Sequence, residues 1–168
     1  MTHPLVLQLR FTRSEFKRAL EGVGKEDARR VFPPMNTIGW CIGHMADQEQ
    51  RYWLRLRLGE LPFPQIHKDF GYGAPARKPD LETVWSAWEA ITAAADPWLD
   101  TLTPSLLSER HLRYPSEDFY TFGSLLQRVI YHYWYHTGEI MAIRQLLGHR
   151  DLPEFVGNID EEAPYLPE

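Results

Sequence analysis

The chain has 168 residues, about the length of one domain, and 43% of them are hydrophobic. This is enough for a packed core, so composition excludes a disordered chain, a collagen-like repeat and a small disulfide-rich fold. The 18 basic and 23 acidic residues give a net charge of −5. Binding along the phosphates of a nucleic acid needs an excess of positive charge, so we expect no nucleic-acid partner.

Two features predict a cytoplasmic protein. Cys41 is the single cysteine, so an internal disulfide cannot form, as is usual in a reducing compartment. Residues 1–10 contain Pro4 and Arg10 and lack the apolar region of a signal peptide. The longest stretch without Asp, Glu, Lys or Arg, residues 31–46, includes two prolines and a histidine, so we also expect no membrane span.

Hydrophobic residues at helical spacing predict the first two helices. The first helix runs from about Thr2 to Leu20. The second begins at an N-cap, Asn36 or Thr37, and runs to Leu58. Its main apolar face consists of residues spaced by three, four and seven, namely Ile38, Ile42, Met45, Tyr52, Trp53 and Leu56.

The same periodicity predicts two further helices. The third runs from Leu81, after an N-cap at Asp80, to about Leu102, and Pro97 is expected to kink it or to end it at Asp96. The fourth runs from Thr121 to Leu147. Gly148 follows it as the residue that closes its C-terminus.

The predicted fold class is all-α, because no segment alternates with period two for long enough to be a strand. We expect one four-helix bundle over 1–148, followed by an acidic, proline-rich tail over 149–168. Residues 59–79 and 108–120 are predicted to be irregular connections, longer than antiparallel neighbours need. The first connection can travel the length of a helix, so helices two and three should run parallel in an up-down-down-up bundle.

The last helix carries two histidines on its most apolar face. His132 and His136 fall within about 80° of the core-facing residues Leu125, Val129, Ile140, Ile143 and Leu147. Buried imidazoles need partners, and one shared metal ion would satisfy both rings. The alternative is a pair of core histidines bonded to tyrosine hydroxyls or to the backbone.

A third ligand has to come from another helix, because two histidines do not complete a metal site. His44 is the one other histidine inside a predicted helix. His3 lies at the frayed N-terminus, and the remaining histidines, His67, His111 and His149, are expected in loops or just past a helix end. It lies on the flank of its helix, with Cys41 three residues before it and Gln48 four after it. Three nitrogens on one ion would leave coordination positions open, as in catalytic sites.

Two segments carry a resemblance to a known family. His132-Tyr-Trp-Tyr-His136-Thr-Gly138-Glu139-Ile140 resembles the H-x-x-x-H-x-G-[EQ]-I pattern in the last helix of the DinB-like family. Ile38-Gly-Trp40-Cys-Ile-Gly-His44 is similar to the helix-two segment of that family, which carries its first histidine. The order of the helices agrees over nearly the whole chain, with the exception of the tail.

The resemblance implies one divalent transition metal bound by His44, His132 and His136. It implies a metal-dependent enzyme acting on a small-molecule substrate, either a transferase or isomerase that uses a low-molecular-weight thiol, or a hydrolase. The alternative is a non-catalytic metal-binding or stress-response protein. Three imidazoles accept zinc, nickel, iron or copper, so the metal is not assigned, and no catalytic residue is indicated.

Three residues are candidates to support the ligands. Glu139 lies about 40° from the line of the two histidines, and Gln48 and Cys41 neighbour His44. If they have no role at the site, Glu139 is a solvated charge, Gln48 is a surface residue and Cys41 is a small buried hydrophobic residue. Asp47 falls opposite the apolar face and is expected to be exposed. A thiol cofactor would favour a basic or polar pocket mouth, for which the sequence offers Arg51, Arg55 and Arg128.

A second apolar stripe on two helices predicts a homodimer. On the last helix it lies about 140° to 180° from Leu125 and consists of Ile130, Trp134 and Met141. On helix two it consists of Trp40, Leu54 and Leu58. Either the tail folds over these residues, or each stripe meets its own copy across a two-fold axis.

Overall fold

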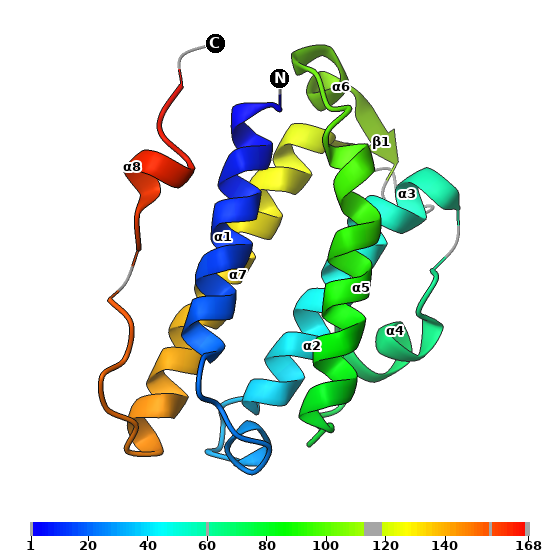
Figure 1. The fold of residues 1–168 in the computed structure, drawn as a ribbon. Coiled ribbons are helices and arrows are strands. Elements are labelled where there is room, and N and C mark those ends of the chain that lie inside the picture. The colour runs from blue at the N-terminus through cyan, green and yellow to red at the C-terminus, as the bar shows by residue number, and fades with distance from the viewer. Residues whose placement is uncertain (1, 60, 113–118, 155, 167–168) are drawn as a thin grey trace.

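A computed structural model describes residues 2–59, 61–112, 119–154 and 156–166, and it is mostly helical. Four long helical segments lie side by side (Figure 1): α1 (Pro4–Leu20), α2 (Ile38–Glu49), α5 (Leu81–Leu99) and α7 (Phe122–Leu146). α2 continues through a π-helical stretch, η2 (Gln50–Leu54), into α3 (Arg55–Leu58). α1 packs mainly on α7, and α2 on α5. In Figure 1 α2 and α5 run in one direction, and α1 and α7 run in the other.

Short elements occupy the connections. They are η1 (Asp27–Arg29), α4 (Pro64–Phe70), α6 (Pro104–Ser108), β1 (Arg110–Leu112), β2 (Phe119–Thr121) and α8 (Ile159–Glu162). The prediction that 59–79 is irregular is wrong, because α4 buries Ile66 and Phe70 there. Two buried residues in a seven-residue helix are too few to show a period among several prolines. The prediction for 108–120 also missed the antiparallel pairing of β1 with β2.

The predicted helix ends are largely confirmed by capping contacts. The hydroxyl oxygen of Thr37 accepts a hydrogen bond from Trp40 N at 3.1 Å, so Thr37 is the N-cap of α2. Asp80 caps α5 in the same way, through Thr83 N. Gly148 follows α7 with φ +82°, a conformation in which a Cβ would be strained.

The helix α5 does not end at Asp96. It continues through Pro97 to the buried Leu99. A proline near a helix terminus removes one hydrogen bond. Here the last turn is held from outside, because the Asp96 carboxylate accepts from Arg13 Nη1 at 2.7 Å, and Arg10 also pairs with it.

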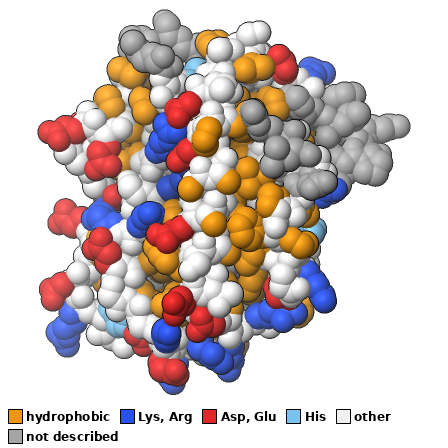
Figure 2. Space-filling model, turned by 45° about the vertical axis from the view of Figure 1, so that its right-hand side comes forward, with side chains coloured by type: hydrophobic (Ala, Val, Ile, Leu, Met, Phe, Trp, Pro, Cys, Tyr) orange, Lys and Arg blue, Asp and Glu red, His pale blue; other side chains and the backbone are white. Residues whose placement is uncertain are grey.

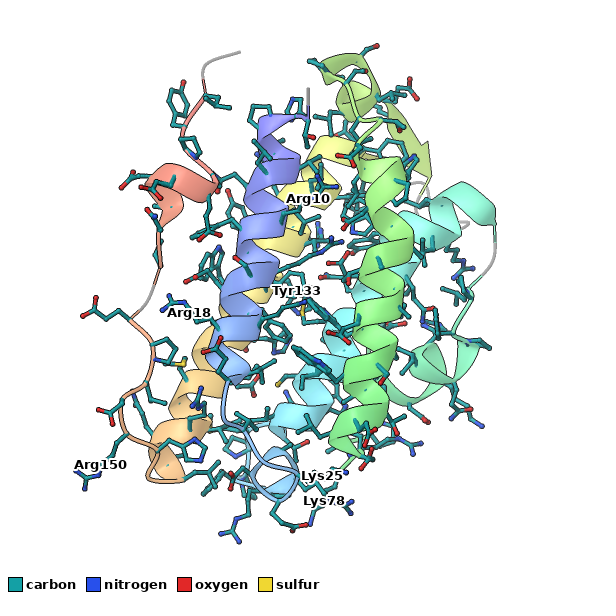
Figure 3. All side chains as sticks on the ribbon, in the orientation of Figure 1. Arg10, Arg18, Lys25, Lys78, Tyr133 and Arg150 are labelled. Atoms are coloured by element: carbon teal, nitrogen blue, oxygen red, sulfur yellow. The ribbon has the colours of Figure 1, made fainter. Side chains whose placement is uncertain are left out.

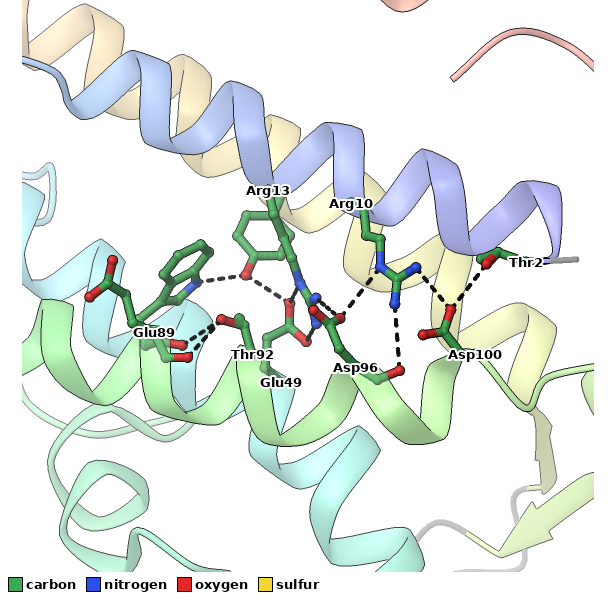
Figure 4. Close-up of polar contacts among 10 residues, drawn as sticks. Thr2, Arg10, Arg13, Glu49, Glu89, Thr92, Asp96 and Asp100 are labelled. Carbon is green, nitrogen blue, oxygen red and sulfur yellow. Dashed lines mark hydrogen bonds and ion pairs between the residues drawn. The ribbon is translucent and has the colours of Figure 1, made fainter. Parts of the chain in front are cut away.

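A buried polar network joins all four long helices (Figure 4). Arg13 of α1 donates from Nε and Nη2 to the two carboxylate oxygens of Glu49 on α2, at 2.8 and 2.7 Å. Tyr133 of α7 donates its hydroxyl to Glu49 Oε1 at 2.8 Å, and Trp88 Nε1 of α5 donates to that hydroxyl at 2.7 Å. Figure 3 shows Tyr133 pointing into the space between the helices. Because each partner comes from a different helix, the network fixes how the four helices face one another.

The second apolar stripes are covered in part within the chain. Ile130, Trp40 and Leu54 are buried, and the ring of Trp134 lies 6.3 Å from that of Phe11 on α1. The side chain of Leu58 lies outside those that the structure describes. Trp134 and Met141 are partly exposed, so the chain itself covers the stripes only in part.

The C-terminal residues return along α1 (Figure 1). Gln8 Nε2 donates to Ala163 O at 2.6 Å, and Gly157 N donates to Glu15 Oε2 at 2.9 Å. On the face drawn in Figure 2, hydrophobic side chains gather near the centre and charges of both signs lie around them. Within the described ranges, no helix is both long and apolar enough to cross a membrane.

Candidate metal centre

Three histidines from two helices converge in the interior. His44 lies on α2, and His132 and His136 lie one turn apart on α7. One ring nitrogen from each residue lies within 4.8 Å of the others. His132 Nε2 and His136 Nε2 are 3.0 Å apart, and the ring of His44 lies 5.0 and 5.3 Å from the other two rings. The structure thus brings together the three histidines that the sequence singled out.

Two of the imidazoles are oriented through their Nδ1 atoms. His44 Nδ1 lies 2.7 Å from Phe70 O at the end of α4, and His136 Nδ1 lies 2.9 Å from Glu139 Oε2. A carbonyl and a carboxylate accept hydrogen bonds, so each Nδ1 carries the proton and each Nε2 keeps its lone pair. This is the tautomer that a metal ligand binding through Nε2 requires.

Burial keeps two of these rings neutral. It lowers the pKa of His132 to about 3 and also lowers the pKa of His44, because an imidazolium is poorly solvated there. The hydrogen bond from His136 lowers the pKa of Glu139 to about 2, so this carboxylate is charged at neutral pH. The centre therefore combines two neutral imidazoles with one supporting negative charge.

The donor set fits a metal ion. Two nitrogens that are each about 2.1 Å from one ion lie about 3.0 Å apart at a right angle and about 3.4 Å apart in a tetrahedron. The 3.0 Å between His132 Nε2 and His136 Nε2 agrees with such sharing. His132 Nδ1 and Gln48 Oε1 are buried and have no hydrogen-bond partner within the described part of the chain. A metal on Nε2 would leave the proton of His132 on Nδ1.

Glu139 and Cys41 lie behind the ligands. Glu139 accepts hydrogen bonds from His136 and from Asn36 N at 3.0 Å, and Cys41 Sγ lies 3.5 Å from Glu139 Oε2. Cys41, His136 and Glu139 also lie close enough to form a metal-binding group of their own. Burial raises the pKa of the Cys41 thiol well above its usual value, so the thiol stays protonated. These contacts therefore position His136.

A pocket of about 380 Å³ opens onto two of the histidines. It is lined by His44, Gln48, Arg51, Tyr52, Arg128 and His132, with the exposed Tyr72 at its edge. Of the three basic residues that the sequence offered for the mouth, Arg51 and Arg128 are present. Gln48, the third supporting candidate, faces the pocket rather than a ligand nitrogen among the contacts described. A small molecule can thus approach the imidazoles from this side.

The expectation that Asp47 is exposed is wrong. Its side chain is fully buried, accepts from Arg51 Nε at 2.7 Å and lies 2.8 Å from His67 Nδ1. α4, which the sequence analysis missed, covers this side of α2. The i, i+4 spacing of Asp47 and Arg51 is the feature from which the ion pair could have been predicted. Trp40 was also missed as a neighbour, and its ring stacks on His44 at 4.6 Å.

Comparison with protein families identifies the chain. The family model described as DinB superfamily matches residues 8–140. The chain belongs to the DinB superfamily. The matched residues include His44, His132 and His136, and the superfamily assignment confirms the resemblance found in the two histidine motifs. A search of curated proteins found no match.

Proposed function

We propose that this DinB superfamily chain is a metal-dependent enzyme in which His44, His132 and His136 bind one divalent transition metal. We further propose that the four long helices form an up-down-down-up four-helix bundle that holds the ligands on α2 and α7. The observation that carries the proposal is the pocket, which reaches His44 and His132 directly. A metal held only for stability would need no such opening.

The favoured reaction class is transfer or isomerisation that uses a low-molecular-weight thiol, with hydrolysis as the other possibility. A divalent metal at this centre would act as a Lewis acid and stabilise a thiolate or hydroxide in its open position. The chain's own residues orient the metal ligands and cover one of them. Phe70 O and Glu139 fix the rings of His44 and His136, and Trp40 covers the His44 face.

A thiol-dependent activity screen tests this proposal. Metal-loaded protein should transfer a thiol to electrophilic model substrates faster than the same protein treated with a chelator. His132→Ala should abolish that difference. His149→Ala is the matched control, because it also removes a histidine but lies beyond the end of α7, where His149 accepts a hydrogen bond from Arg144 Nε.

The outcome separates the proposed enzyme from the alternative. A protein that binds metal through these histidines but shows no metal-dependent turnover with thiols or hydrolysable esters would be a non-catalytic metal-binding or stress-response protein. Equal activity in His132→Ala and in the wild type would refute the proposed role of the centre.

A further inference from the structure

We propose that the pocket beside the histidines binds the carboxylate of a small substrate through Arg51 and Arg128. This inference rests on the proposed function, because it assigns the substrate class of the same site. The contact between the carboxylate and the arginines would hold the substrate at a second point, beside the metal. The substrate would carry a metal-binding atom, such as a thiol sulfur, and a carboxylate a few bonds away.

Arg51 is held in place from behind. Its Nε donates to the fully buried Asp47 at 2.7 Å, and its guanidinium lies 5.4 Å from the ring of Tyr52. An arginine anchored in this way loses little side-chain freedom when a ligand binds, which favours affinity. Asp47 is fixed in turn by His67 of α4.

The local backbone supports the same arrangement. Arg51 and Tyr52 lie in the π-helical stretch η2, and π-turns inside α-helices occur frequently at functional sites. The side chain of Gln50 pins this stretch to the start of α4, through Phe63 N at 3.1 Å and Phe63 O at 3.0 Å. The η2 side of the pocket wall is therefore held from behind by hydrogen bonds to the start of α4.

Arg128 approaches from the opposite helix. It lies four residues before His132 on α7, so both side chains face the same side of that helix. The exposed guanidinium of Arg128 lies 5.3 Å from the ring of Tyr120. One turn of helix rises about 5.4 Å. A carboxylate on Arg128 would therefore lie within a few bonds of an atom bound beside His132.

Charge and size favour a small anion such as a carboxylate. Arg51 and Arg128 contribute two positive charges and Asp47 one negative charge, while Gln48 and Tyr52 are neutral. Among the described residues that line the pocket, two are arginines and none is acidic, which favours an anionic group. A pocket of about 380 Å³ is at the small end of ligand sites.

Cobalt-substituted full-length protein allows a direct test, because Co²⁺ absorbs visible light in a way that reports its ligands. The probes are 3-mercaptopropionate and 3-mercaptopropanol, which share a thiol and differ in charge. We expect the carboxylate probe to bind at least about tenfold more tightly, the gain of one charge-assisted hydrogen bond. In Arg128→Gln the ratio should fall to about twofold or less.

Two further variants make the test specific. Arg150→Gln removes the same charge at the far end of α7 (Figure 3) and should leave the ratio unchanged. Arg51→Gln alone would leave Asp47 buried without its cation, so it is made together with Asp47→Asn. This double variant should also lose the preference for the carboxylate while binding one cobalt ion per chain.

The results distinguish failure of the subsite from failure of the centre. If both thiols change the cobalt spectrum with equal affinity, or if Arg128→Gln keeps the tenfold ratio, the carboxylate subsite is refuted and the proposed metal centre stands. If cobalt does not bind, or neither thiol changes its spectrum, the proposed function and the subsite fail together.

Discussion

Replacing Glu49 by Gln should destabilise the protein more than any change at an exposed glutamate. Glu49 is fully buried and accepts two hydrogen bonds from Arg13 and one from Tyr133, at 2.7 to 2.8 Å. Burial raises the pKa of Tyr133 well above its usual value, so the hydroxyl remains a donor. The amide of Gln keeps the shape of the side chain and removes the charge.

The expected loss follows from the contacts. A hydrogen bond to a charged group contributes about 1.5–3 kcal/mol and a neutral one about 0.5–1.5 kcal/mol. In Gln, the remaining oxygen can still accept from Tyr133 and Arg13 Nε as weaker neutral bonds, but the NH2 group in place of Oε2 cannot accept from Arg13 Nη2. Asp96, which lies 2.7 Å from Arg13 Nη1, offsets part of the loss. We therefore expect a loss of about 2 kcal/mol in the free energy of unfolding, or about 4–8 °C in Tm.

Urea unfolding followed by circular dichroism measures this loss. Glu82→Gln is the matched control, because Glu82 is 77% exposed and pairs with Lys25 at the surface, where an ion pair contributes little. Glu49→Ala should cost more, about 3–5 kcal/mol, because it leaves Arg13 without its buried partner. If Glu49→Gln and Glu82→Gln unfold at the same urea concentration, the network does not hold the helices together.

Three other predictions follow from single contacts, and a fourth concerns assembly. Thr37→Ala removes the α2 N-cap and should cost about 1 kcal/mol in thermal unfolding, whereas Thr37→Ser should restore most of it. Glu139→Gln removes the carboxylate behind His136 and should weaken metal affinity by about 10–100-fold in competition with a chelator. The hydrogen bond from Arg10 lowers the pKa of Asp100, so its stabilising effect should be present above about pH 4 and lost on acidification below it. The Tm difference between wild type and Asp100→Asn should therefore be larger at pH 6 than at pH 2.5. The homodimer stays a prediction that light scattering tests, and a mass near 19.7 kDa would contradict it.

The long helices were predictable because their signals are local and repeated. Thr37, Asp80 and Gly148 mark ends by capping chemistry that depends on a few neighbouring residues. The mostly helical fold and the superfamily also followed from sequence. α4 was missed because its two buried residues, Ile66 and Phe70, give no repeated period.

At the site, sequence periodicity identified His132 and His136, and exclusion of the other histidines identified His44. It failed for Asp47, because the side of a helix opposite its apolar face is buried when another element covers it. Here that element is α4, and its placement depends on contacts such as Gln50 with Phe63. The pocket likewise depends on how α7 brings Arg128 towards α2, which no local pattern specifies.

Metal content per chain tests the central claim most directly. The protein should be purified without an affinity tag, and its metals measured by elemental analysis beside the variant in which His44, His132 and His136 are all alanine. The account predicts about one divalent transition metal ion per wild-type chain and none in the variant, with His149→Ala unchanged. One tightly bound metal per chain in the triple variant would contradict it.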